Sequence, residues 1–247
     1  MYRNINKKIL RVVTMIVIIF IILFVVGMLL LRYQVEGESN MPFRISKISI
    51  IESVEGIENK DAKEKWNFNV NENNDIYIYI EKNADYGKTE IIDKIKISNI
   101  QINRQSKRGE IKYYKPTKEE KRIFNNTEEN EITELTYEGD LTSNLKEQKI
   151  SNQGGIIAFR YAINDIAKYA TQEYQEIDHS QLLKLTNIKK EDIETNITFD
   201  IEMDLKSGKK YQATIEQQIT SDDVINKGTA WTEKTDINDV IFKRVEN

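Results

Sequence analysis

An uncharged apolar stretch, residues 12–31, constrains the fold more than any other feature of the sequence. Arg11 and Arg32 bound it, and none of the residues between them carries a charge. A helix of this length rises roughly 30 Å, at about 1.5 Å per residue, which matches the hydrocarbon core of a bilayer. The sequence therefore predicts one transmembrane helix over residues 12–31, with the lipid bilayer as its partner.

The charges beside this stretch predict its orientation. All the charged residues before the stretch are basic, whereas two glutamates follow soon after Arg32. Positively charged flanks remain on the cytoplasmic side of a membrane. We therefore expect a single-pass protein of the cell membrane with a cytoplasmic tail over residues 1–11 and an extracellular C-terminal domain.

A cleaved signal peptide is the alternative interpretation of the same stretch. Signal peptides have an apolar region of about 7–15 residues, followed by small residues at the cleavage site. The stretch in this chain is longer, and the weak cleavage pattern around Gly37 lies beyond Arg32. We therefore expect an uncleaved anchor, followed by a polar stalk over residues 32–42.

The rest of the chain is acidic and contains no cysteine. The formal charge of the whole chain is −4, and the first 34 residues contribute +5, which leaves −9 for the remainder. Such a body repels nucleic acid at long range, so no nucleic-acid partner is expected. The lack of cysteine excludes disulfides, thiolate metal ligands and cysteine nucleophiles, and we expect no cofactor. The abundance of Ile, Lys and Asn is typical of an AT-rich bacterial genome.

Many short runs beyond residue 42 alternate apolar and polar residues, as half-buried strands do. In residues 197–205 every second side chain is apolar, and the pattern resumes at Tyr211 after a Ser-Gly turn, which predicts a β-hairpin. In residues 93–104 the alternation slips at Ser98 and Asn99, which predicts a β-bulge. Other runs rich in Ile, Tyr and Phe occur at residues 43–51, 66–70, 75–83, 109–116, 132–137, 154–163 and 239–245.

About ten such runs with little helix between them predict an all-β fold. We expect an extracytoplasmic β-sandwich, either as one large domain or as two tandem Ig-like sandwiches. A polar connector over residues 117–131 separates a first half, 43–116, from a second half, 132–247. Thr117 and Glu120 have the spacing of a capping box, which predicts a short helix in that connector.

Four aromatic residues are the candidate ligand-binding side chains. Tyr77 and Tyr79 share one face of a run whose other face is isoleucine, with Trp66 nearby in the sequence. Core packing is the simpler role of these three residues, and an aromatic platform for sugar rings is the alternative. Trp231 lies in "KGTAWTEK", which indicates a polar loop; we expect its ring to be partly buried over a sheet end.

Acidic residues are numerous, but none forms a clear metal site. Asp200, Glu202 and Asp204 alternate along one face of the predicted hairpin and are weak candidates for a calcium site. Successive residues on one strand face lie about 7 Å apart, so the wetted face of a sheet is their simpler role. The segments "NENND" (71–75) and "SDD" (221–223) indicate turns before they indicate calcium.

Catalysis is not expected from the residue types present. His179 is the only histidine, in the polar segment "EIDHSQ", and a general base needs a partner and a cleft. The leading interpretation is a non-catalytic binding or scaffold protein of the bacterial cell envelope, with a protein or cell-wall partner outside the cell. The alternatives are a cell-surface carbohydrate-binding module and an envelope hydrolase that uses paired carboxylates.

The anchor and three segments carry a weak resemblance to a group of known proteins. The segments are "NNDIYIYIEKN", "SNQGGIIAFRY" and "NDVIFKR". With them, the chain resembles single-pass membrane-anchored proteins of clostridia-like Gram-positive bacteria that have no assigned activity. The resemblance implies a location and a β-rich external part, and it carries over no functional residue.

Overall fold

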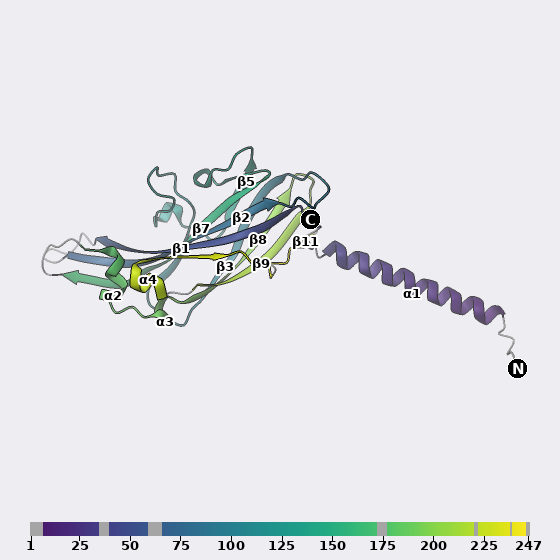
Figure 1. Ribbon diagram of the computed structural model, residues 1–247, viewed down its shortest axis with the longest axis horizontal. Coiled ribbons are helices and arrows are strands. Elements are labelled where there is room, and N and C mark those ends of the chain that lie inside the picture. The colour runs from purple at the N-terminus through teal and green to yellow at the C-terminus, as the bar shows by residue number, and fades with distance from the viewer. Residues whose placement is uncertain are drawn as a thin grey trace.

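One long helix extends away from a body of two β-sheets (Figure 1). The computed structural model describes residues 7–34, 40–58, 66–171, 177–219, 222–237 and 239–245. The helix α1 (Lys7–Gln34) contains an apolar segment, Ile9–Leu31, with a mean hydropathy of 3.3 and none of it buried. Within the described residues it is the one helix that is long and apolar enough to cross a membrane.

The body consists of a five-stranded and a six-stranded sheet. In spatial order the five-stranded sheet is β10 (Thr229–Lys234), β1 (Phe43–Glu58), β2 (Trp66–Lys82), β7 (Gly154–Thr171) and β4 (Glu110–Tyr114). The six-stranded sheet is β11 (Lys243–Val245), β9 (Lys210–Ile219), β8 (Thr195–Leu205), β3 (Ile92–Asn103), β5 (Leu135–Asp140) and β6 (Lys149–Ser151). The pairs are antiparallel except β5 with β6. The expected all-β fold after one apolar helix is confirmed.

Each sheet takes strands from both sides of the connector at residues 117–131. In the five-stranded sheet β2 pairs with β7 along nearly its whole length, and in the six-stranded sheet β3 pairs with β8. Two tandem sandwiches would keep such pairs within one half of the chain. The strand pairing therefore fits one continuous two-sheet domain and does not fit two tandem sandwiches.

Apolar side chains from the two sheets meet in one core. On β2, Ile76, Ile78 and Ile80 point inward and are almost fully buried. Phe159 of β7 and Phe199 of β8 pack edge to face across the sheets, with ring centroids 5.1 Å apart. Burial of each such side chain contributes roughly 1.5–3 kcal/mol, so this interface holds the sheets together without disulfides.

The predicted hairpin and bulge are both present. β8 and β9 form the hairpin, and Gly208 in its turn has a φ of 83°. The register of β3 against β8 shifts between Ser98 and Gln101, and Asn99 takes a left-handed φ of 52° there. One extra residue in β3 therefore restores the inward alternation after the slip.

Three local predictions are wrong. Residues 117–124 form no helix; Phe124 instead packs against the outer face of the five-stranded sheet, where this burial outweighs helix propensity. The "NENND" segment is no turn, because it lies in the middle of β2. Trp231 lies in strand β10 and not in a loop, and its ring is 70 % exposed instead of partly buried.

Short helices gather at the end of the sandwich that lies away from α1 (Figure 1). They are η3 (His179–Gln181), α2 (Leu182–Leu185), α3 (Lys190–Ile193) and α4 (Asp222–Lys227). We call this end the far end. The opposite end carries β11, which contacts α1. Two further short helices, η1 (Glu128–Asn130) and η2 (Leu145–Glu147), lie in the loops between β4 and β6.

Candidate functional site

The outer face of the five-stranded sheet carries three of the four aromatic candidates. Tyr77 is paired with Ser49, Tyr79 with Lys47, and Trp231 with Ile51. These positions alternate with the buried isoleucines of β1 and β2, so the three aromatic rings face away from the core. Trp66 begins β2, but its side chain lies outside the described residues.

A groove of about 450 Å³ crosses this outer face, and we call it the outer groove. Its floor comes from β1, β2 and β7, and one wall comes from the segment around Phe124. The ring of Phe124 lies 6.3 Å from that of Tyr77, edge to face, and 5.1 Å from the Arg160 guanidinium. The lining residues are Ser53, Val54, Glu55, Asn73, Asp75, Tyr77, Arg122, Ile123, Phe124, Arg160 and His179.

The charged groups of the outer groove neutralise one another. Arg160 donates two hydrogen bonds, of 2.5 and 3.1 Å, to the carboxylate of Asp75, and Arg122 donates one of 3.0 Å to Glu55. Burial raises the pKa of Asp75 in spite of the Arg160 pair, and burial raises the pKa of Tyr77 to about 12. The outer groove is therefore an aromatic surface without a net charge to select an ionic ligand.

Among the described side chains of the sandwich, Trp231 is the most exposed aromatic, at 70 % exposure, and Ile51 beside it is 41 % exposed. Both lie at the margin of the sheet, since β10 is its edge strand. Tyr77 and Tyr79 are only half-buried, but Phe124 packs against the first and the Lys47 ammonium lies 4.3 Å from the ring centroid of the second. Trp231 is thus the ring best placed to contact a ligand.

The backbone of β10 alternates between its neighbour and the open edge. The N–H of Val54 donates to the carbonyl of Gly228 just before β10. In an antiparallel pair, hydrogen-bonded and non-hydrogen-bonded positions alternate, so Ala230 and Thr232 bond to β1. The N–H and C=O groups of Thr229, Trp231 and Glu233 consequently point away from β1, toward the side where no other described strand pairs.

His179 is one of the residues that line the outer groove. It is exposed, and its Nδ1 accepts a 3.3 Å hydrogen bond from the N–H of Gly56. Its ring also packs edge to face against Phe68, with centroids 6.2 Å apart. These contacts give His179 a role in packing η3 against β1.

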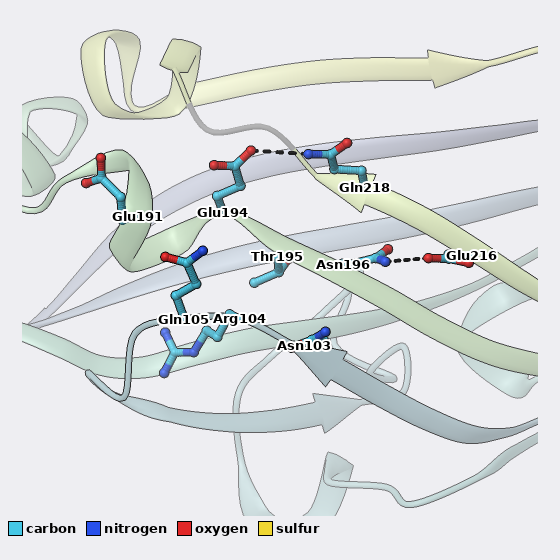
Figure 2. Close-up of a pocket in the computed structure, with 9 residues that line it drawn as sticks. All are labelled: Asn103, Arg104, Gln105, Glu191, Glu194, Thr195, Asn196, Glu216 and Gln218. Atoms are coloured by element: carbon cyan, nitrogen blue, oxygen red, sulfur yellow. Dashed lines mark hydrogen bonds between the residues drawn. The ribbon is translucent and has the colours of Figure 1, made fainter.

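A second, larger hollow of about 600 Å³ opens at the far end, and we call it the far-end pocket. Figure 2 shows Arg104 and Gln105, which follow β3, on one side and Glu191 and Glu194 on the other. The remaining lining residues are Asn103, Thr195, Asn196, Glu216 and Gln218. Amides donate to two of the carboxylates, from Gln218 to Glu194 and from Asn196 to Glu216. Three glutamates and one arginine give this pocket an acidic lining.

Two of the three carboxylates of β8, those of Asp200 and Asp204, contact neighbouring polar or charged side chains. Asp200 accepts hydrogen bonds from Asn99, Gln212 and Thr214. Asp204 lies 3.4 Å from the ammonium of Lys94 and 3.5 Å from that of Lys210. Glu202 shares their outward face. In the described part of the chain no group of three or more His, Asp or Glu side chains is arranged to hold a metal ion.

No family model, curated protein or solved structure matches the chain. The resemblance to membrane-anchored clostridial proteins therefore remains an expectation. The polar residues of the far-end pocket were not singled out from the sequence, because they come from β3, α3, β8 and β9. Their proximity depends on sheet order, which alternation within one strand does not reveal.

Proposed function

We propose that this chain is a single-pass protein of the bacterial cell envelope, without catalysis, whose sandwich binds an extended segment of a partner protein along β10. The observation that carries the proposal is that one six-residue strand combines an exposed tryptophan with a backbone edge that no other described strand pairs. The sandwich would lie outside the cytoplasm, anchored by α1.

The anchor supports the envelope location. The apolar segment of α1 is unburied over Ile9–Leu31, and lipid would cover the surface that the sandwich leaves bare. The charged residues before this segment are all basic, which favours a cytoplasmic N-terminus. With that orientation β10 faces the extracytoplasmic space.

The edge of β10 supports strand addition as the binding mode. Proteins that protect an edge strand place proline, lysine or a bulge in its middle, and β10 has lysine only at its last position, Lys234. Thr229, Trp231 and Glu233 present their backbone groups to the open edge. A partner strand would pair with those groups, and its side chains would alternate over Trp231 and Ile51.

Trp231 supports a protein rather than a saccharide ligand. Tryptophan is enriched among the residues that contribute most to protein–protein binding. A sugar platform needs several rings with open faces, but Phe124 packs against Tyr77 and Lys47 covers Tyr79. Trp231 and the exposed aliphatic side chain of Ile51 form a smaller apolar patch at the sheet edge, which suits a side chain of an added strand.

The test is photo-crosslinking of the full-length chain in its native cells. A benzophenone amino acid at Thr229, on the open edge, should capture a specific protein, whereas the same group at Thr214 of β9 should not capture it. Glu233→Pro removes one outward N–H, and Glu233→Ala is its matched control, since both lose the ion pair with Lys47. We expect Glu233→Pro and Trp231→Ala to reduce the crosslink at least tenfold and Glu233→Ala to preserve it.

Two results would contradict the proposal. Equal crosslinking by Glu233→Pro and Glu233→Ala would exclude strand addition, and binding of purified wall polysaccharide that only Trp231→Ala removes would favour the carbohydrate-binding alternative. Protease added to intact cells tests the location separately. Survival of the sandwich behind an unbroken membrane would reverse the orientation.

A further inference from the structure

Three polar side chains lie inside the sandwich, on the inner face of the five-stranded sheet near the far end. They are Glu52 of β1 and Glu72 and Asn74 of β2, each at most 1 % exposed. Glu52 is directly paired with Asn74, and Glu72 is two residues further along β2 on the same face. Directly opposed residues on neighbouring strands have Cβ atoms about 5 Å apart, and diagonal ones about 7 Å, so the three side chains form one cluster.

The cluster contains more oxygen acceptors than hydrogen-bond donors. The amide nitrogen of Asn74 donates to both carboxylate oxygens of Glu72, at 2.7 and 2.6 Å. Both oxygens of Glu52 and the amide oxygen of Asn74 are buried without a hydrogen-bond partner among the described residues. Buried polar atoms are nearly always paired, and a buried carboxylate without a partner costs several kcal/mol. Three such oxygen atoms on one pair of strands require an explanation.

The groups that face the cluster do not supply this partner. Tyr161 of β7 and Thr195 of β8 share a 2.7 Å hydrogen bond with each other. The Arg104 guanidinium lies near enough to favour ionisation of Glu72, but its hydrogen bonds go to the carbonyl oxygens of Asp192, Arg108 and Gly109. Asp223 of α4 adds a negative charge near Glu52. The sum of the charges around the cluster is negative.

The far-end pocket lies beside the cluster. Arg104 and Thr195 line the pocket. Arg104 also interacts electrostatically with Glu72, and Thr195 shares a hydrogen bond with Tyr161, whose hydroxyl interacts electrostatically with both glutamates. The lining of the pocket includes Glu191, Glu194 and Glu216 (Figure 2). An acidic lining raises the local concentration of cations and disfavours anions.

We propose that Glu52, Glu72 and Asn74 bind a calcium ion inside the sandwich, which enters through the far-end pocket. All the available donors are carboxylate or amide oxygens, the ligands of hard divalent cations. Calcium accepts bidentate carboxylates and irregular geometry, whereas magnesium demands a near-octahedral shell. Two glutamates also balance the charge of one divalent ion. The ion would pair the three orphaned oxygen atoms and link β1 to β2.

The test is calcium binding to the purified full-length chain in detergent micelles. Calorimetry at pH 7.5, after treatment with chelator, should show one site, and millimolar calcium should raise the melting temperature. Glu52→Gln keeps the shape of the side chain and removes the charge; it should weaken binding at least tenfold. Glu202→Gln on the outer face of β8 is the matched control and should bind calcium as the wild type does.

Absence of any heat or melting shift in the wild type up to about 10 mM calcium, beyond the weakest extracellular sites, would overturn the proposal. Equal calcium affinity of Glu52→Gln and wild type would overturn it also, since the ion would then lie elsewhere. If Glu52→Gln does not fold, Glu72→Gln replaces it with the same expected loss. Neither result depends on the partner proposed for β10, because the readout is the isolated chain.

Discussion

The hydroxyl of Tyr137 on β5 forms hydrogen bonds with both the N–H and the C=O of Ala158 on β7, although the two strands belong to different sheets. Its hydroxyl donates a 2.6 Å hydrogen bond to the carbonyl of Ala158 and accepts a 3.1 Å bond from the N–H of the same residue. β4 covers β7 only from Arg160 to Asn164, so Ala158 has no strand partner on that side. The buried side chain of Tyr137 therefore takes the place of a neighbouring strand at this point of β7.

Tyr137→Phe should destabilise the sandwich. The substitution keeps the ring in the core and leaves a buried N–H and C=O unpaired, which costs about 1–3 kcal/mol. Urea unfolding of the full-length chain in micelles, followed by tryptophan fluorescence, measures the change. Tyr79→Phe is the control, because no hydrogen bond ties its hydroxyl in the described structure; equal midpoints for the two variants would contradict the argument.

Gly139 of β5 should tolerate no side chain. A Cβ atom at this position would collide with the backbone carbonyl oxygen of Ile92 and lie 2.9 Å from that of Asp93. Backbone in a paired strand cannot move aside cheaply, so we expect Gly139→Ala to cost about 2 kcal/mol or more. Gly87 has open space around it, and Gly87→Ala should change the free energy of unfolding by less than about 1 kcal/mol. Similar melting temperatures for the two alanine variants would disprove the close approach.

Asn99 should be replaceable by glycine but not by valine. Its φ of 52° is left-handed, and a β-branched side chain in that region is strained by about 1–2 kcal/mol. Asn99→Gly loses the hydrogen bond to Asp200 at an exposed position but relieves the backbone. We expect Asn99→Val to lower the melting temperature clearly and Asn99→Gly to lower it little. The opposite ranking would mean that the bulge is not held by this residue.

The hairpin and the bulge could be predicted because both follow from the alternation of apolar and polar residues along the chain. The β8–β9 hairpin follows from strict alternation around a Ser-Gly turn, and the bulge follows from the slip at Ser98 and Asn99. Both are properties of neighbouring residues. The failed helix at residues 117–124 shows the limit: Thr117 and Glu120 fit a capping box, but contact of Phe124 with Tyr77 and Arg160 depends on residues far away in the sequence.

The candidate sites were less predictable because they violate the alternation rule. "NENND" contains polar residues that are typical of turns, yet Glu72 and Asn74 occupy core positions of a central strand. β10 has a polar sequence, and none of its six residues is fully buried. Trp231 was singled out from the sequence, but its exposure follows only from the position of β10 at the sheet edge.

Without calcium, the free energy of unfolding should fall as the pH rises from about 5 to 7. Burial, with a contribution from Asp223, raises the pKa of Glu52 from 4.5 to about 7. Between these values the folded state retains a proton that the unfolded state releases, so the free energy of unfolding falls by about 2 kcal/mol from pH 5 to 7. Burial also raises the pKa of Glu72, which acts in the same direction. Chelator-treated wild type should show this slope in urea titrations, and Glu202→Gln should retain it. Glu52→Gln should make the slope shallower, because the glutamine has no proton to lose and only the contribution of Glu72 remains. An unchanged slope in Glu52→Gln would assign the proton to another group.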